Sequence, residues 1–183
     1  MRLLLLTLAL LVQPAFASSR FQSGTTPWDG RQATRNATLL RSAMLKGHND
    51  ARRAYGVPAL GWSEPLARDA AVYARRLAAT APFAHDPQRG VRAPQGENLF
   101  KGTRGAYSYT AIVGLWVDER RWFRRGRFPD VVTSGHWSRV AHYTQIIWPS
   151  TRQFGCALAV NAREDFLVCR YLPAGNYFGV MLR

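Results

Sequence analysis

The chain has 183 residues and a formal net charge of +14 at pH 7. This is the length of one domain that can bury a core without many crosslinks, which argues against several domains. The charge predicts attraction to anionic phospholipid, acidic envelope polymers or nucleic acid, of which we expect nucleic acid least; a genome rich in Arg codons would give the same composition.

The first 17 residues have the three parts of a signal peptide. Arg2 supplies positive charge, and Leu3–Val12 is an apolar run shorter than the ~20 residues that span a bilayer. The small-x-small sequence AFA ends at Ala17. An uncleaved anchor is the alternative, but Pro14 interrupts the end of the run. We therefore predict cleavage after Ala17, a secreted or periplasmic protein, and no transmembrane segment in the mature chain. The oligomeric state stays open.

Residues 18–38 are rich in Ser, Thr, Gly, Gln and Arg, which predicts a flexible N-terminal lead-in. Apolar residues at helical spacing then predict three helices, over 39–55, from Ser63 through 77, and over 106–123. Gly56 is a predicted C-cap for the first helix and Ser63 a predicted N-cap for the second. The third helix would carry four residues on one face, namely Ile112, Leu115, Trp116 and Glu119.

Three strands are predicted after the helices. The first is Tyr143–Trp148, which would begin directly after His142. The other two, 154–160 and 165–171, would form a hairpin around the sequence NARE. Pairing the two ends of that turn brings Cys156 opposite Cys169, where a cross-strand disulfide is plausible. An exported protein reaches a compartment in which such a disulfide persists.

Both faces of the predicted hairpin are apolar, so both should be covered. Phe154, Cys156 and Leu158 share one face, while Ala157 and Val168 lie on the other. With helices enough for two layers, this predicts an α+β fold, a three-layer α-β-α sandwich with a central, mainly antiparallel sheet.

Two histidines and two glutamates are the candidate functional residues. They are His85 in FAHDP, Glu97 in QGENLF, Glu119 in LWVDERRW and His142 in VAHYTQIIW. Two imidazoles and two carboxylates can hold a divalent metal such as Zn²⁺ or exchange protons. Each also has an ordinary explanation: a loop histidine often only hydrogen-bonds, and Glu119 could pair with an arginine. Spacing alone does not bring the four together.

Four sequence motifs, in order, carry a family resemblance. HNDARRAYGVPAL, GENLF, AHYTQIIWPST and CRYLPAGNYFG resemble the signatures of the CAP superfamily of cysteine-rich secretory proteins, antigen 5 and pathogenesis-related proteins, also called the SCP domain. The match spans residues 48–179, so we assign residues 39–183 to a CAP/SCP domain of the single-domain bacterial type. The chain departs from the family in its few cysteines and in Ala141, where Gly is usual.

The resemblance implies an α-β-α sandwich and a cleft in which His85, Glu97, Glu119 and His142 converge. In some relatives the two histidines bind a metal, usually zinc. With only two strong ligands, we expect a weak site completed by water. His48, Asn49 and Arg52 of the first motif are interpreted as a structural brace.

A basic aromatic loop follows the third predicted helix. Its members are Arg120, Arg121, Trp122, Phe123, Arg124, Arg125, Arg127 and Phe128. Arginine beside aromatic rings suits a membrane interface or an anionic ligand, and a loop in this neighbourhood has been linked to sterol binding in relatives. The alternative is an arginine-rich helix end whose side chains cover its own aromatic rings.

Three functions are compatible with these features. The first is an exported binding protein whose cleft holds a divalent metal and a small or lipid ligand, with a basic surface for anionic envelope partners. The second is a metal-dependent hydrolase of peptides or esters, with Glu97 or Glu119 as the candidate catalytic group. The third is a cationic envelope-active protein that works through surface charge. The resemblance does not imply an established catalytic activity.

Overall fold

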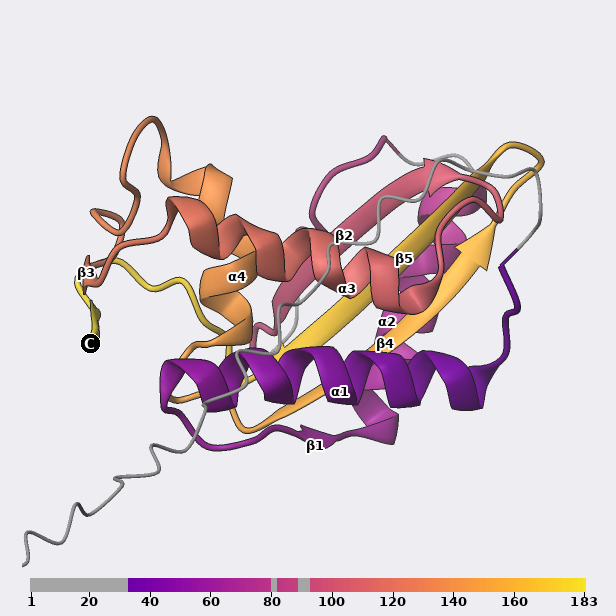
Figure 1. Ribbon diagram of the computed structural model, residues 1–183. Coiled ribbons are helices and arrows are strands. Elements are labelled where there is room, and N and C mark those ends of the chain that lie inside the picture. Colours follow the sequence, from indigo (N-terminus) through magenta and orange to yellow (C-terminus); the bar gives the residue numbers. More distant parts are fainter. Residues whose placement is uncertain (1–32, 80–81, 89–92) are drawn as a thin grey trace, which may run out of the picture.

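The computed structural model describes residues 33–79, 82–88 and 93–183. The predicted signal peptide, and the lead-in up to residue 32, lie outside these ranges. Figure 1 shows the elements in chain order, which are α1 (Ala37–Tyr55), β1 (Gly61–Trp62), α2 (Glu64–Ala79), β2 (Gly96–Thr103), α3 (Tyr109–Asp118), β3 (Gly126–Arg127), α4 (Ala141–Ile146), β4 (Gln153–Val160), β5 (Glu164–Leu172) and β6 (Met181–Leu182). Two 3-10 turns, Glu119–Trp122 and Trp137–Val140, precede β3 and α4 respectively.

The main sheet has the strand order β1-β4-β5-β2, and β3 pairs with β6 in a separate two-stranded sheet. Strand β1 runs parallel to β4, while β4 with β5 and β5 with β2 are antiparallel. The β4–β5 register places Cys156 opposite Cys169, and the two form a disulfide. The predicted hairpin, its register and its disulfide are therefore confirmed. Sequence analysis missed β2, the edge strand that contains the motif GENLF.

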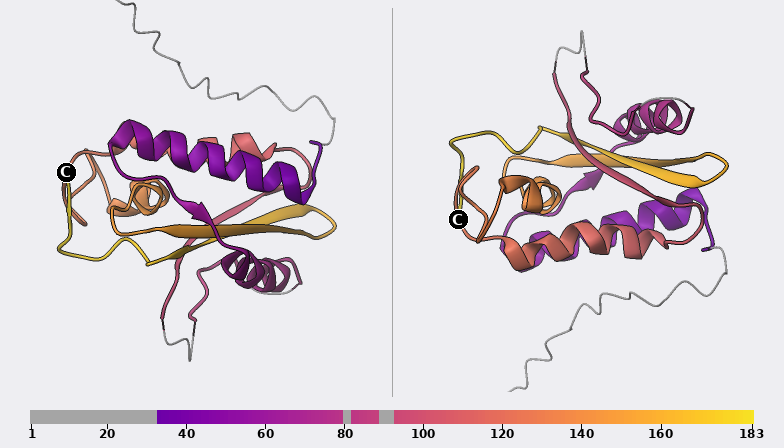
Figure 2. Two further views of the ribbon diagram at one scale, coloured as in Figure 1. Left: turned by 90° about the horizontal axis from the view of Figure 1, so that it is seen from below. Right: turned by 90° about the horizontal axis from the view of Figure 1, so that it is seen from above.

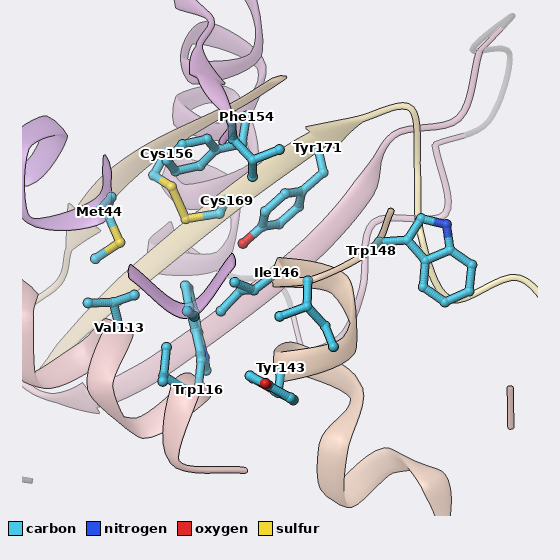
Figure 3. Packing of buried hydrophobic residues seen from close by; sticks show 14 of the residues in the cluster. Met44, Val113, Trp116, Tyr143, Ile146, Trp148, Phe154, Cys156, Cys169 and Tyr171 are labelled. Atoms are coloured by element: carbon cyan, nitrogen blue, oxygen red, sulfur yellow. A yellow bond between two sulfur atoms is a disulfide. The ribbon is translucent and has the colours of Figure 1, made fainter. Parts of the chain in front are cut away.

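Helices cover both faces of the main sheet, as Figure 2 shows, with α2 on one face and α1, α3 and α4 on the other. Each face has its own apolar cluster. The cluster under α2 consists of Ala70, Tyr73, Ala74, Leu77, Leu99, Phe166 and Val168. The larger cluster on the other face includes Met44, Val113, Trp116, Tyr143, Ile146, Phe154, Cys156 and Tyr171, which Figure 3 shows around the disulfide. The predicted three-layer α-β-α sandwich, with a mainly antiparallel sheet, is confirmed.

Two glycines allow the layers to approach closely. A Cβ on Gly47 of α1 would lie 2.5 Å from a methyl carbon of Val113 in α3, and a Cβ on Gly155 of β4 would lie 2.3 Å from the backbone nitrogen of Ala67 in α2. Both distances are shorter than side chains tolerate, so a larger residue at either position would push a helix away from its neighbour.

Helix boundaries follow local capping. Helix α1 begins two residues earlier than predicted because the Asn36 side chain accepts the Leu39 N–H, and it ends at the left-handed Gly56 as predicted. Helix α3 is shorter than predicted, since Ser108 caps it and it ends at Asp118. Leu115, predicted to share one face with Ile112 and Trp116, is 44% exposed, whereas those two residues are buried.

The predicted strand at Tyr143–Trp148 is also wrong. Residues 141–146 form the short helix α4, so His142 lies in the first turn of a helix and not at the start of a strand. All six residues from Tyr143 to Trp148 are buried. Polar Thr144 and Gln145 are buried together with the apolar residues around them, so this short run has no polar face whose period could distinguish a helix from a strand.

The first motif provides polar contacts in the interior. The Nδ1–H of His48 donates to the Met44 carbonyl and its Nε2 accepts from the Tyr171 hydroxyl. Burial lowers the pKa of His48 to about 3, so this ring is neutral at physiological pH. Asn49 exchanges two hydrogen bonds with the Leu60 backbone.

Arg52 joins the end of α1 to the segment after α4. Its guanidinium is fully buried and donates to four backbone carbonyls, those of Pro58, Ile146, Trp148 and Thr151. Burial lowers its pKa to about 10, which leaves it protonated at pH 7. These contacts hold the end of α4, and the segment that follows it, against the end of α1.

Candidate functional site

The first histidine–glutamate pair lies where α3 meets α4. Glu119 Oε1 lies 2.6 Å from His142 Nδ1, and its Oε2 accepts the backbone N–H groups of His142 and Tyr143, each at 3.0 Å. The His142 ring stacks on Trp116, with ring centres 5.6 Å apart. Glu119 therefore caps the first turn of α4 and fixes the imidazole at the same time.

The second pair lies at the start of β2. His85 Nδ1 is 2.7 Å from Glu97 Oε1, which also accepts the backbone N–H of Asp86 at 3.1 Å. The Glu97 side chain is only 4% exposed, whereas that of His85 is 68% exposed. The Tyr73 hydroxyl donates to the Ala84 carbonyl and holds the segment before His85 against α2. A buried carboxylate thus orients a surface imidazole.

Arg170 supports this second pair from inside the protein. It lies opposite Glu97 in the β2–β5 register, is 3% exposed, and packs its guanidinium over the Tyr73 ring. Its Nη2 is 2.7 Å from Asp86 Oδ2 and 3.1 Å from Glu97 Oε2. Burial alone would raise the pKa of Asp86, but the hydrogen bond and charge of Arg170 hold that pKa below its ordinary value.

Two adjacent residues of β2 connect the pairs. Glu97 belongs to the second pair, and the Nδ2 group of Asn98 donates to the His142 carbonyl at 3.2 Å. Successive side chains of a strand point to opposite faces, so the edge strand serves both pairs. Across residues 33–79, 82–88 and 93–183, no group of three or more His, Cys, Asp or Glu side chains is arranged to hold a metal ion. The four predicted residues are thus placed as two linked pairs.

The hydrogen bonds determine the tautomer of both histidines. A carboxylate accepts hydrogen bonds, so Nδ1 carries the proton in His85 and in His142. In the neutral ring, Nε2 then has a free lone pair. A carboxylate behind an imidazole is the usual support for a metal-binding histidine, because it fixes the ring and raises its donor strength. Each pair therefore offers one imidazole nitrogen of the kind that can bind a divalent ion such as Zn²⁺.

The aromatic members of the predicted basic aromatic loop make internal contacts. Phe128 is fully buried, and Trp122 and Phe123 pack against the larger core cluster. The guanidinium of Arg139 lies 4.1 Å from the Trp122 ring centre, and that of Arg125 lies 4.9 Å from Tyr55. Arginines of the protein thus lie beside these two rings, while the five arginines of the predicted loop are themselves exposed.

Asp86 and Arg170 were not predicted as site residues. Asp86 directly follows a predicted site residue, which was the one local signal. Arg170 could have been found only by pairing β5 with β2, and β2 was not predicted.

Comparison with known proteins places the chain in a family. Residues 45–171 match the cysteine-rich secretory protein (CAP) family. This chain belongs to the CAP family. It is 34% identical over 140 residues to pathogenesis-related protein PRMS of Zea mays, covering 74% of this chain and 78% of that protein. It is 35% identical over 134 residues to pathogenesis-related protein 1 of Arabidopsis thaliana, covering 73% of this chain and 76% of that protein.

Solved structures agree on the fold of this CAP protein. The crystal structure of NaASP2 with Zn²⁺ superposes with a TM-score of 0.62 at 21% identity, over 82% of this chain and 88% of that one. Schistosoma mansoni venom allergen-like protein 4 superposes with a TM-score of 0.56 at 18% identity, over 76% of this chain and 94% of that one.

Two CAP motifs meet in this structure. The Thr144 hydroxyl donates to Asn176 Oδ1 at 2.7 Å, and Gln145 Oε1 accepts the Gly175 N–H at 2.9 Å. Thr144 and Gln145, which follow His142 in its motif, therefore hold the C-terminal motif against α4.

The family and the disulfide fit an extracellular protein. Within the described part of the chain, no helix combines the length and apolar character needed to cross a bilayer.

Proposed function

We propose that this CAP-family protein is an exported binding protein in which His85 and His142 hold a divalent metal ion through their Nε2 atoms. The observation that carries the proposal is the pairing of each Nδ1 with a carboxylate, at 2.7 Å and 2.6 Å. In this arrangement the Nε2 atoms of both rings are unprotonated, and a carboxylate orients each ring. Zinc is the first ion to test, because NaASP2, which shares the fold, has a crystal structure with Zn²⁺.

The proposed site is weak. Closed zinc sites use four protein ligands, whereas this one would use two imidazoles and leave the remaining positions to water or a ligand. A divalent ion in such a site can attract an anionic small molecule. The work of this chain's own residues is orientation: Glu119 and Glu97 hold the rings, and Arg170 holds Glu97.

The contacts of the two glutamates favour binding over hydrolysis. Both oxygens of Glu119 already accept hydrogen bonds, three in total. Oε1 of Glu97 accepts two, and its Oε2 faces Arg170. A general base needs an oxygen within reach of the attacking water, and these oxygens are directed at the protein. The hydrolase alternative requires an activity that Glu119→Gln removes.

The second part of the proposal is an anionic partner at the cell envelope. The formal charge of +14 supports it, since a strongly basic exported protein concentrates at anionic surfaces. Association with vesicles that contain anionic lipid should weaken as salt rises, because the Debye length shortens from ~10 Å at 0.1 M to ~3 Å at 1 M. A purely cationic mechanism would show the same salt dependence but would not need either histidine.

Calorimetric titration with zinc tests the metal proposal. Wild-type protein should bind zinc saturably, and His85→Ala and His142→Ala should each abolish or greatly weaken that binding. His136→Ala is the matched control, because His136 is an exposed histidine whose ring contacts Ser138. Equal binding by the wild type and both site variants would reject the proposal.

A further inference from the structure

The exposed apolar surface of the protein is concentrated near its C-terminus. Among the described residues, five large apolar side chains with substantial exposure fall within residues 172–181. They are Leu172, Tyr177, Phe178, Val180 and Met181. Phe178 is 68% exposed and Tyr177 is 53% exposed. Aromatic side chains this exposed are unusual on a soluble surface, and their grouping is typical of an interaction site.

These side chains stand on an ordered support. Strand β6 pairs with β3, so that Met181 lies opposite Arg127, and the Gly179 N–H donates to the Phe128 carbonyl. The Phe178 ring lies 5.6 Å from the ring of Phe128 and 6.2 Å from that of Trp137. Figure 1 places β3 and the C-terminus together at one end of the molecule. Phe128, which is buried, and Trp137, which is partly buried, thus support the Phe178 ring from beneath.

The surroundings of these side chains are basic. Residues 120–139 contain six arginines and one acidic residue, Asp130, and residues 172–183 contain Arg183 and no acidic residue. Arg127 of the first segment is exposed and donates to the Gly179 carbonyl of the second. The exposed apolar side chains are therefore bordered by arginines, so one surface offers both apolar contact and positive charge.

We propose that Tyr177, Phe178, Val180 and Met181, with Arg127 and Arg183, form an aromatic end that docks on the surface of an anionic phospholipid bilayer. Aromatic rings favour the headgroup level, while arginines pair with lipid phosphates. An acidic glycan fits less well, because Phe, Val and Met offer no hydrogen bonds to sugar hydroxyls. This inference rests on the anionic partner of the proposed function and names its contact surface. Phe128, an aromatic member of the predicted basic aromatic loop, supports this end from within.

Vesicle sedimentation tests the inference. The wild type should bind phosphatidylcholine vesicles only when they also contain phosphatidylglycerol. Tyr177→Ser with Phe178→Ser should weaken this binding by about tenfold or more, since each ring transfers apolar area out of water. Phe178→Leu should retain most of it, which separates apolar contact from a fold defect. The matched control is Val72→Ser with Leu115→Ser, two exposed apolar residues elsewhere, and it should bind as the wild type does.

The outcomes separate this inference from the proposal on which it rests. If wild type binds anionic vesicles and the Tyr177/Phe178 double variant binds equally well, the aromatic end is wrong and the anionic partner stands. If the wild type binds no anionic vesicle but binds an anionic polysaccharide, docking on a bilayer is rejected and the anionic partner is a polymer. If it binds neither, both the inference and the anionic partner fail, while the zinc titration is unaffected.

Discussion

In the His142–Glu119 pair the carboxylate accepts three hydrogen bonds and the imidazole rests on the Trp116 ring. In the His85–Glu97 pair the carboxylate is almost fully buried, yet its imidazole is mostly exposed. The first pair is built into the junction of two helices. The second is an outer loop tied to the sheet through one buried arginine. Their Nδ1 contacts are nearly the same length, so the support behind each carboxylate is what differs.

This difference shows how two sites of the same chemistry can depend on different parts of a fold. Glu119 stabilises α4, so its loss should affect folding and ring orientation together. Glu97 depends on Arg170, so removing Arg170 should leave two carboxylates without a counter-charge, one of them almost fully buried. Changes at Arg170, Glu119 and Asp86 separate these dependences, and His48 serves as a reference.

The largest effect is expected from Arg170→Met. It would leave Glu97 buried without its counter-charge and Asp86 without its ion pair, and breaking a buried pair from one side costs about 3–5 kcal/mol. Urea unfolding should show this loss in the free energy of unfolding. The triple variant that adds Glu97→Gln and Asp86→Asn should regain part of it, because the unpaired charges are gone. A loss below about 1 kcal/mol would contradict the role of Arg170.

The buried His48 provides a reference histidine without a carboxylate partner. Its pKa is lowered to about 3 by burial, from 6.5 in the unfolded chain, so the unfolded state binds the extra proton between these values. Its contribution to stability is therefore complete above pH 6.5 and decreases as the pH falls toward about 3, by up to about 1.4 kcal/mol per pH unit. Urea unfolding from pH 7 to 4 should show this slope. His48→Gln should reduce this slope by the amount that corresponds to nearly one bound proton. An unchanged slope would show that another group is responsible.

An intermediate effect is expected from Glu119→Ala. The backbone N–H groups of His142 and Tyr143 lose their acceptor, which should cost about 1–3 kcal/mol and weaken zinc binding. Glu119→Gln keeps one acceptor oxygen and should lose less stability. If alanine and glutamine variants unfold at the same urea concentration as the wild type, Glu119 does not cap α4.

The smallest effect on stability is expected from Asp86→Asn. The Asp86 side chain is 23% exposed and Arg170 keeps Glu97 as a counter-charge, so the loss should be about 1 kcal/mol or less. Zinc affinity should nevertheless fall by up to about tenfold, since supporting residues orient the ligand that they hold. Unchanged zinc affinity would show that the His85 loop does not need this anchor.

The sequence predicted the parts of the fold that depend on local pattern. Helical spacing located α1 and α2, and the turn NARE fixed the β4–β5 register and the disulfide. The pattern failed for α4 because this six-residue helix buries polar Thr144 and Gln145 together with apolar Tyr143 and Ile146, which leaves no periodic contrast. Strand β2 was missed because GENLFKGT mixes glycine, charge and apolar residues without clear alternation. Its place at the sheet edge is a tertiary property.

The candidate site shows the same division. Motifs drew attention to the two histidines and two glutamates, but which carboxylate holds which ring depends on tertiary placement. Glu119 and His142 meet only because α3 ends beside α4. Arg170 supports Glu97 only because two strands far apart in the sequence are paired.

The most direct test of the metal proposal follows the imidazole nitrogens themselves. Nitrogen NMR of the four histidines during zinc titration should show Nε2 of His85 and His142 shifting together and saturating at one equivalent, while each Nδ1 stays protonated. His48 should not respond, because its Nε2 accepts the Tyr171 hydroxyl. A shift in only one of the two rings, or in neither, would contradict a metal ion shared by the two histidine–glutamate pairs.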